Sequence, residues 1–290
     1  MIKYIDPYTD FGFKKLFGEE ANKDLLIDFL NAILPEKHRI KTLNFRNTEQ
    51  LGPIYDDRKA VFDIFCEAES GEQFIVEMQK VKQRYFKDRA VFNTSFVIRE
   101  MVERGGEWNY ELPTIYFIGI LNFIIDEERQ KQLINVALRD ENGVLFYDKL
   151  HYIFLQMPLF TKSEAELETP KDKWLYFLKN LTDFDEVPAI FREQVFERAF
   201  ETAAVARMSK REYQCYEANL KVHRDNYSAM EMAEYEARNK GHAEGHAEGH
   251  AEGEIHKAIE IARNMKNEGL DLSFIVKVTS LTTEEIEQLD

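Results

Sequence analysis

Two neighbouring apolar segments, Ala60–Ala68 and Phe74–Val81, constrain the fold of this chain most strongly. Both are rich in Val, Ile and Phe, which favour β-strands. The polar stretch between them, Ser70-Gly71-Glu72, is typical of a hairpin loop. We predict a three-residue loop in which Gly71 supplies a positive φ. The pattern therefore predicts an antiparallel hairpin.

Polar side chains interrupt both apolar segments at related positions. Period-two alternation places Glu77 and Gln79 on one face of their strand, and Asp63 lies between apolar residues on the partner strand. The three-residue loop would set Glu69 opposite Gln73, which places Asp63 opposite Gln79 and diagonal to Glu77. Two buried carboxylates repel each other, and a bound divalent cation commonly neutralises this repulsion. The alternative is a strand with one face in water, on which these polar residues have no function.

The surrounding segments predict a sheet covered by helices. A strand is expected around Lys41–Phe45, a buried central strand at Leu112–Ile125, and one or two strands in Val144–Phe160. Amphipathic helices are expected over Lys23–Leu34 and Tyr85–Arg104, the latter ending at Gly105-Gly106. This order predicts an α/β fold with a mixed central sheet flanked by helices, occupying residues 1–165.

The rest of the chain predicts an all-helical C-terminal region. We expect an acidic helical extension over residues 166–236, a Gly-His-Ala-Glu repeat segment over 237–256, and a small tail resembling a helix-turn-helix over 257–290. Thr282 and Glu285 form a capping-box pattern in that tail. Its last helix is acidic and would repel phosphate, which favours a protein contact or oligomerisation over DNA recognition.

The repeat spaces three histidines at intervals of four residues: His242, His246 and His250. On a helix they would form a drifting stripe, which is compatible with a solvated or self-associating helix and, less favourably, with a transition-metal site. Glycine at every fourth position weakens such a helix.

Composition limits the remaining possibilities. The net charge of −15 excludes a protein that coats nucleic acid with its whole surface, but not a local basic patch. The two cysteines, Cys66 and Cys215, are too few for a disulfide framework. The first residues contain no apolar stretch of signal-peptide length, and the longest apolar run is shorter than the ~20 residues of a membrane span. We expect a cytoplasmic protein that makes no membrane contact.

The acidic motif resembles a known signature. Asp63, thirteen intervening residues and then Glu77-Met78-Gln79 resemble the Asp…Glu-x-Lys pattern of the restriction-endonuclease-like, or PD-(D/E)XK, superfamily. More closely, the chain is similar to the bacterial recombination-promoting nuclease and transposase family over roughly residues 4–122, and more loosely to about Tyr227. The matching pieces are Asp10–Gly18, Leu26–Leu34, Phe74–Gln79 and Arg89.

The resemblance implies a restriction-endonuclease-like core and Mg²⁺-dependent hydrolysis of DNA phosphodiester bonds, with Mn²⁺ as a substitute ion. It assigns Asp63, Glu77 and the Met78 carbonyl to the metal, which would lower the pKa of a bound water and stabilise charge on the phosphate. Gln79 stands where the superfamily has Lys; an amide has no proton that titrates near neutrality, so it can orient water but cannot act as a general base. A third acid from the first helical region, Glu19, Glu20 or Asp24, could complete the metal site, and the sequence does not choose among them.

A basic patch follows the acidic motif: Lys82, Arg84, Lys87 and Arg89. These cations could hold DNA phosphates beside the cut, although a solvated helix face has the same pattern. We predict an endonuclease linked to recombination, mobile elements or phage defence, and a dimer, because a single-site enzyme needs two copies to cut both strands. The alternatives are a catalytically silent DNA-binding or regulatory relative, marked by Gln79, and a protein-interaction module.

Overall fold

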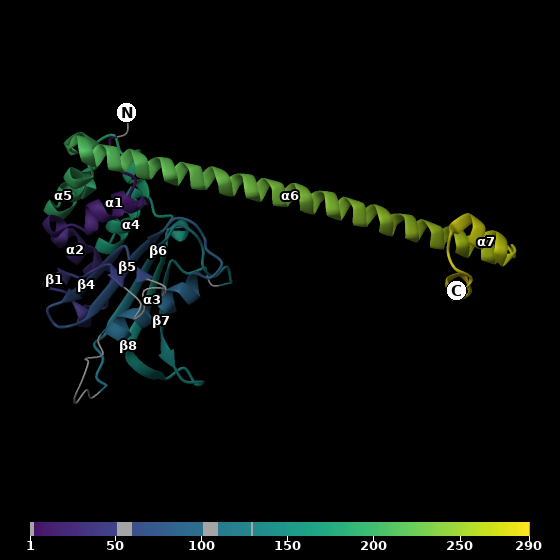
Figure 1. Ribbon diagram of the computed structural model, residues 1–290, viewed down its shortest axis with the longest axis horizontal. Helices are drawn as coiled ribbons and strands as arrows, with labels where there is room; N and C mark the ends of the chain where they lie inside the picture. The colour runs from purple at the N-terminus through teal and green to yellow at the C-terminus, as the bar shows by residue number, and fades with distance from the viewer. Residues whose placement is uncertain (1–2, 51–59, 101–109, 129, 290) are drawn as a thin grey trace. The chain divides into compact units, whose positions relative to one another are not determined.

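The computed structural model describes residues 3–50, 60–100, 110–128 and 130–289. A six-stranded mixed sheet, ordered β1-β4-β5-β6-β8-β7, forms the centre of the first of two compact units, Met1–Lys221 (Figure 1). Its strands are β1 (Leu43–Phe45), β4 (Ile64–Ala68), β5 (Gln73–Gln79), β6 (Ile115–Leu121), β7 (Leu133–Arg139) and β8 (Leu145–Gln156). β5, β6 and β8 are parallel, and the outer pairs are antiparallel. A separate ribbon joins β2 (Glu49–Gln50) to β3 (Ala60–Val61). The α/β fold with a mixed sheet flanked by helices is confirmed.

The predicted strand over Ala60–Ala68 divides at Phe62-Asp63 into β3 and β4, and the predicted central strand is β6, which is buried along its whole length. The sequence patterns missed β7, whose exposed Val136 and Leu138 do not alternate with polar residues as on a one-sided strand.

The β4–β5 hairpin forms with a register two residues away from the one we expected. The sequence placed Asp63 opposite Gln79, whereas the structure pairs Ile64 with Val76 and Glu67 with Gln73, which brings Asp63 beside Glu77. The loop does have three residues, but it begins one residue earlier: Ala68 donates its N–H to the Glu72 carbonyl, and Gly71, with φ +97°, closes the turn. Because the shift is even, Asp63 and Glu77 still share a face.

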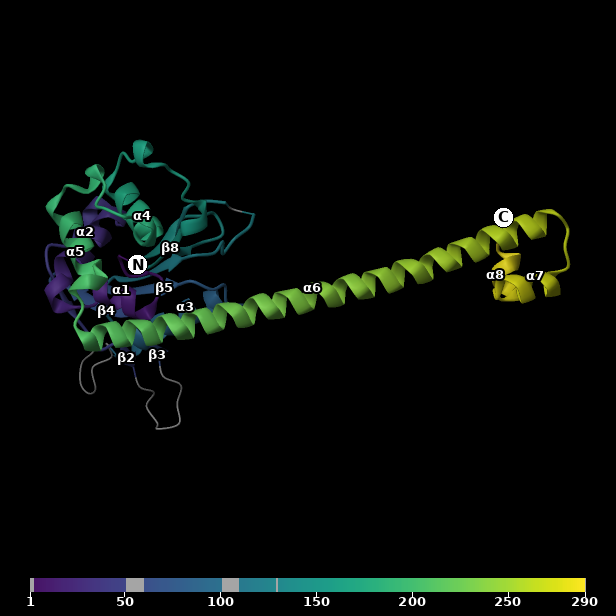
Figure 2. The ribbon, with the colours of Figure 1, turned by 90° about the horizontal axis from the view of Figure 1, so that it is seen from above.

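Helices cover both faces of the sheet. α1 (Asp10–Phe17), α2 (Lys23–Ile33), α4 (Pro170–Asn180) and α5 (Gln194–Ala203) enclose the larger core, which includes Phe29, Val76 and Trp174. α3 (Phe86–Glu100) covers the other face through Phe86, Ala90 and Val97. Figure 2 shows α3 and α4 on opposite sides of β5 and β8. α4 and α5 come from the predicted acidic extension, yet their apolar faces complete the core. The predicted helix stop at Gly105-Gly106 lies outside the described residues.

The C-terminal residues form a unit of their own, Val222–Asp290. α6 (Lys210–Asn267), a continuous helix of 58 residues, starts before this unit and includes the Gly-His-Ala-Glu repeat. α7 (Leu272–Thr279) and α8 (Thr283–Glu287) pack with the end of α6 around Ala262, Ile275 and Ile286. The predicted capping box of Thr282 and Glu285 is present. No helix in the described part of the chain is both long and apolar enough to cross a membrane.

Candidate active site

The two acids of the motif meet where the β4–β5 ladder ends. The last pair of this ladder is Ile64 with Val76, so Met78 lies beyond it. Its N–H donates instead to Oδ2 of Asp63, at 2.8 Å. The Asp63 carboxylate therefore continues the strand pairing with its side chain, and this contact holds it beside Glu77.

Glu77 is fully buried, with an exposed fraction of 0%. Two residues of α3, spaced one helical turn apart, bind its carboxylate: Arg89 Nη2 donates to Oε2 at 3.0 Å, and Asn93 Nδ2 donates to Oε1 at 2.8 Å. Asn93 is itself buried. α3 is thus the element that fixes the orientation of Glu77, because both donors project from one face of that helix.

Burial raises the pKa of Glu77 to about 7. The Arg89 guanidinium opposes this rise, the neighbouring Asp63 carboxylate adds to it, and hydrogen bonds from Asn93 and Gln79 lower it again. Gln79 is therefore a partner of Glu77, on the face that the alternation predicted. Burial also raises the pKa of Asp63, while the Met78 N–H lowers it.

An acid that sequence reasoning did not select acts on this site. Asp10, at the start of α1, raises the pKa of Asp63, and Lys14, one turn later, lowers it. The Asp10 and Lys14 side chains form an ion pair at 2.7 Å. Asp10 is the first residue of the Asp10–Gly18 segment, one of the segments that resemble the nuclease family. That resemblance was the sequence signal that could have identified Asp10 as a site residue. The three acids considered instead are paired elsewhere, Glu19 with Lys15, Glu20 with Lys23, and Asp24 with Arg198.

The segment before α1 is tied to the end of β5. Lys80, directly after Gln79, contacts the Asp6 carboxylate at 3.2 Å. A side chain at Gly12 would meet the Asp6 carbonyl, since a Cβ there would lie 2.1 Å from that oxygen. The absence of a side chain at Gly12 lets the preceding turn, with the Asp6 carbonyl and the Thr9 hydroxyl, pack directly against α1.

The four basic residues predicted to bind DNA do not form one cluster of contacts; each has its own surroundings. Arg89 contacts Glu77, Lys82 forms an ion pair with Glu127 at 2.9 Å, and the guanidinium of Arg84 lies over the Tyr85 ring at 5.2 Å. Lys87 is exposed on α3. Lys82 and Arg84 precede α3 and Lys87 lies in its first turn, whereas Arg89 forms an ion pair with Glu77.

The donor set at this site suits a hard divalent cation. Asp63 and Glu77 supply carboxylate oxygens, and an oxygen-only set is what Mg²⁺ and Mn²⁺ accept. Their mutual repulsion, which helps to raise the pKa of Glu77, is the electrostatic condition that a cation relieves. Within the described residues no group of three or more His, Cys, Asp or Glu side chains gathers as a metal cluster, and this includes His242, His246 and His250 on α6.

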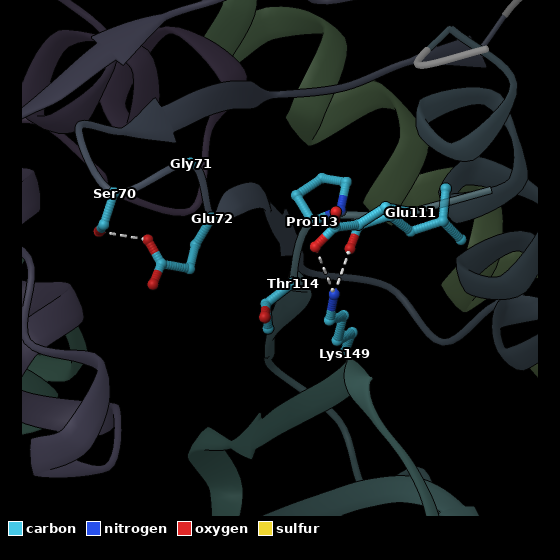
Figure 3. Close-up of a pocket in the computed structure, with 8 residues that line it drawn as sticks. Ser70, Gly71, Glu72, Glu111, Pro113, Thr114 and Lys149 are labelled. Carbon is cyan, nitrogen blue, oxygen red and sulfur yellow. Dashed lines mark hydrogen bonds and ion pairs between the residues drawn. The ribbon is translucent and has the colours of Figure 1, made fainter. Parts of the chain in front are cut away.

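A separate cavity of about 360 Å³ lies at the other end of β5, where the strand begins (Figure 3). In it Lys149 contacts the Leu112 carbonyl at 3.0 Å and the Glu111 carboxylate at 3.6 Å, while Glu72 accepts a hydrogen bond from Ser70. Its polar groups are thus largely satisfied by one another. The length of β5 separates this cavity from Glu77 and Gln79.

Comparison with known proteins gives two family matches. The model described as the PD-(D/E)XK nuclease family transposase matches residues 7–233, and the model described as the Rpn/YhgA-like nuclease family, C-terminal HTH domain, matches residues 256–290. No curated protein and no solved structure matches the chain.

Proposed function

The chain belongs to the PD-(D/E)XK nuclease transposase family, and from this premise we propose that it is a metal-dependent DNA endonuclease with its active site at Asp63, Glu77 and Gln79. The observation that carries the proposal is the buried Glu77, whose pKa is raised to about 7, beside the half-buried carboxylate of Asp63, which accepts a hydrogen bond from the Met78 N–H. Perturbed acids of this kind gather at functional sites.

Asp63, Glu77 and the Met78 carbonyl would hold the cation, Mg²⁺ or Mn²⁺, with Asp10 as a further acid nearby. When bound, such an ion polarises the scissile phosphate and lowers the pKa of a coordinated water. Gln79 keeps a hydrogen bond to Glu77 and can orient water, but its amide cannot take up a proton. Asn93 and Arg89 fix the Glu77 carboxylate, so that the acid is oriented before substrate arrives.

DNA would approach along the start of α3. Lys82, Arg84 and Lys87 are exposed there and can contact phosphates on either side of the cut, which gives affinity without sequence specificity. Arg89 adds positive charge next to Glu77. We further propose that the protein acts in the cytoplasm as a dimer, in recombination, mobile-element movement or phage defence.

One observation favours a second candidate, a catalytically silent DNA-binding relative. Both carboxylate oxygens of Glu77 already have donors, Arg89 and Asn93, and Gln79 replaces the usual Lys. An arginine beside a buried acid supplies some of the neutralising charge that a metal would bring.

Cleavage of supercoiled plasmid with Mg²⁺ or Mn²⁺, beside EDTA controls, tests both candidates. We expect the unaltered protein to nick DNA and Asp63→Asn and Glu77→Gln to be inactive. Glu72→Gln, in the cavity at the other end of β5, is the matched control and should remain active. If the unaltered protein binds DNA without cutting it, the silent relative is correct; if all variants cut alike, the active site is elsewhere.

A further inference from the structure

The two residues of α3 that bind Glu77 differ in charge and in exposure. Asn93 is neutral and buried, and it donates to Oε1. Arg89 is positively charged, its side chain is 35% exposed, and it donates to Oε2. A cation placed beside Glu77 would repel Arg89 and leave Asn93 in place, because only Arg89 carries a like charge. Arg89 is therefore the donor that a metal ion would compete with.

Arg89 has the electrostatic role that a bound cation would have at this site. Its guanidinium lowers the pKa of Glu77 and also that of Asp63, so one positive charge acts on both proposed metal ligands. An ionised carboxylate has about four acceptor positions, so the hydrogen bonds from Arg89 and Asn93 leave Glu77 room for a bond to a metal. The charge of the guanidinium, rather than the number of hydrogen bonds, opposes a cation at Glu77.

The other terminal nitrogen of Arg89 contacts the segment proposed to bind DNA. Nη1 donates to Oε1 of Gln83 at 3.2 Å, and Gln83 is an exposed residue between Lys82 and Arg84. A guanidinium binds phosphate through two parallel hydrogen bonds, whereas only one of its nitrogens donates to Glu77. A DNA phosphate bound by this segment would therefore meet a guanidinium that already contacts the segment.

We propose that Arg89 exchanges partners when substrate binds: in the free protein it takes the place of the cation at Glu77, and with DNA it moves to a backbone phosphate and admits the cation. This inference rests on the proposed function and adds to it that DNA and metal strengthen each other's binding. Without DNA, the cation meets the Arg89 charge. Without the cation, departure of Arg89 leaves the Glu77 charge buried and unpaired. The two effects are equal in size, because coupling between two binding sites is reciprocal.

Mn²⁺ affinity without DNA tests the first half of this exchange. Isothermal titration calorimetry of the full chain at pH 8, above the Glu77 pKa of about 7, limits competition from protons. We expect Arg89→Met to bind Mn²⁺ about tenfold more tightly than the unaltered protein, a size typical of coupled sites. Gln83→Ala removes only the outer contact of Arg89 and should give a smaller gain. Arg99→Met is the matched control and should change nothing, since Arg99 is exposed on the same helix with its guanidinium over the Phe96 ring.

Duplex affinity tests the second half. Fluorescence anisotropy of a labelled DNA duplex, in Ca²⁺ and in EDTA at equal ionic strength, measures how much a cation strengthens DNA binding, and a gel verifies that the duplex stays intact. This strengthening should be about tenfold smaller in Arg89→Met than in the unaltered protein, because the variant has no cation to transfer to the phosphate. Arg99→Met should behave like the unaltered protein.

The possible outcomes separate this inference from the proposed function. Mn²⁺ binding by Arg89→Met that is no tighter than in the unaltered protein, with the fold verified by circular dichroism, would overturn the exchange and leave Arg89 only to orient Glu77, as Asn93 does. Equal strengthening of duplex affinity by Ca²⁺ in both proteins would overturn the move to phosphate. If neither the unaltered protein nor any variant binds Mn²⁺, the proposed metal site fails and this inference fails with it.

Discussion

Burial makes ionisation of the Glu77 carboxyl group energetically costly. The unfolded chain releases the Glu77 proton near pH 4.5, whereas burial raises the folded pKa to about 7. The stabilisation from this group is therefore fully present below pH 4.5 and is lost as pH rises through 7.

The substitution Glu77→Gln removes that titration. Without metal, we expect the variant to be more stable than the unaltered protein at pH 8, by up to about 3 kcal/mol, since one pKa unit corresponds to ~1.4 kcal/mol. The gain is smaller to the extent that the Gln amide loses the contact with Arg89. At pH 5 the advantage should disappear. Urea unfolding at both pH values in EDTA measures it, and an equal effect at pH 5 and pH 8 would show that the raised pKa is not the cause.

Asn93 contacts the site through its hydrogen bond to Glu77. Asn93→Ala removes the 2.8 Å donor to Oε1 and leaves a buried acceptor unpaired. We expect Mn²⁺ affinity to fall about 10- to 100-fold, as for other partners of metal ligands. Isothermal titration calorimetry with Mn²⁺ measures this directly. Ser95→Ala, exposed on the same helix, is the matched control; a loss of the same size there would point to general damage to α3.

The sequence was enough to predict some residues of the candidate active site but not their full arrangement. Alternation along β5 was enough to place Glu77 and Gln79 on one face, because side chains on a strand change face at every residue. It could not fix the start of the turn, and so the partner of Asp63 was wrong by two residues. Alternation could not identify Asp10 either, because its approach to Asp63 depends on the packing of α1; the family resemblance of the Asp10–Gly18 segment was the signal that could have pointed to it.

Among the elements, α1 depends on a glycine. A Cβ at Gly12 would overlap the Asp6 carbonyl, a backbone atom that can move only with its neighbours. We expect Gly12→Ala to destabilise the protein by about 1–3 kcal/mol, as overpacking of a core does, and to weaken cleavage by displacing Asp10. Thermal unfolding measures the first effect. Gly245→Ala, whose added Cβ meets nothing within 4 Å, is the control, and equal stability of the two variants would contradict the role assigned to Gly12.

α6 contains a run of glycines that tertiary contacts do not explain. A methyl group added at Gly241, Gly245, Gly249 or Gly253 would meet nothing within 4 Å, so alanine fits at each position. Each replacement favours the helix by about 1 kcal/mol. The fourfold Gly→Ala variant should show stronger helical ellipticity at 222 nm and a higher melting temperature. A weaker signal would mean that these glycines make a close contact that alanine blocks.

Periodic segments were the elements that sequence could place. The helix expected over Lys23–Leu34 is α2, Lys23–Ile33, and the run of apolar residues in Leu112–Ile125 is β6. The sequence did not predict β7, because this edge strand has exposed apolar residues. It shows neither the alternation of apolar and polar residues nor the continuous apolar run by which strands are recognised. The packing of α4 and α5 onto the core through Trp174 and Phe200 is a tertiary choice, which local propensity does not specify.

Over the whole molecule, the groups of the candidate active site belong to the first unit, Met1–Lys221. The larger core is complete within it, including Tyr216 and Leu220 at the start of α6. We expect a chain ending at Lys221 to fold and to retain metal-dependent nicking. Plasmid cleavage and circular dichroism of this truncation provide the measurement. A truncated protein that folds but no longer cuts would assign part of the chemistry to the C-terminal unit.

The turn between β4 and β5 has a consequence for the gene. If the loop kept its three residues, adding or removing one codon between those for Ala68 and Glu72 would slip the strand pairing by one residue and turn Asp63 to the opposite side of the sheet from Glu77. A change of two codons would keep them together, as the two-residue difference between the expected and observed pairing illustrates. Where the acidic pair is retained, an inherited insertion or deletion of one codon should therefore lengthen or shorten the loop itself and leave the pairing of Ile64 with Val76 unchanged.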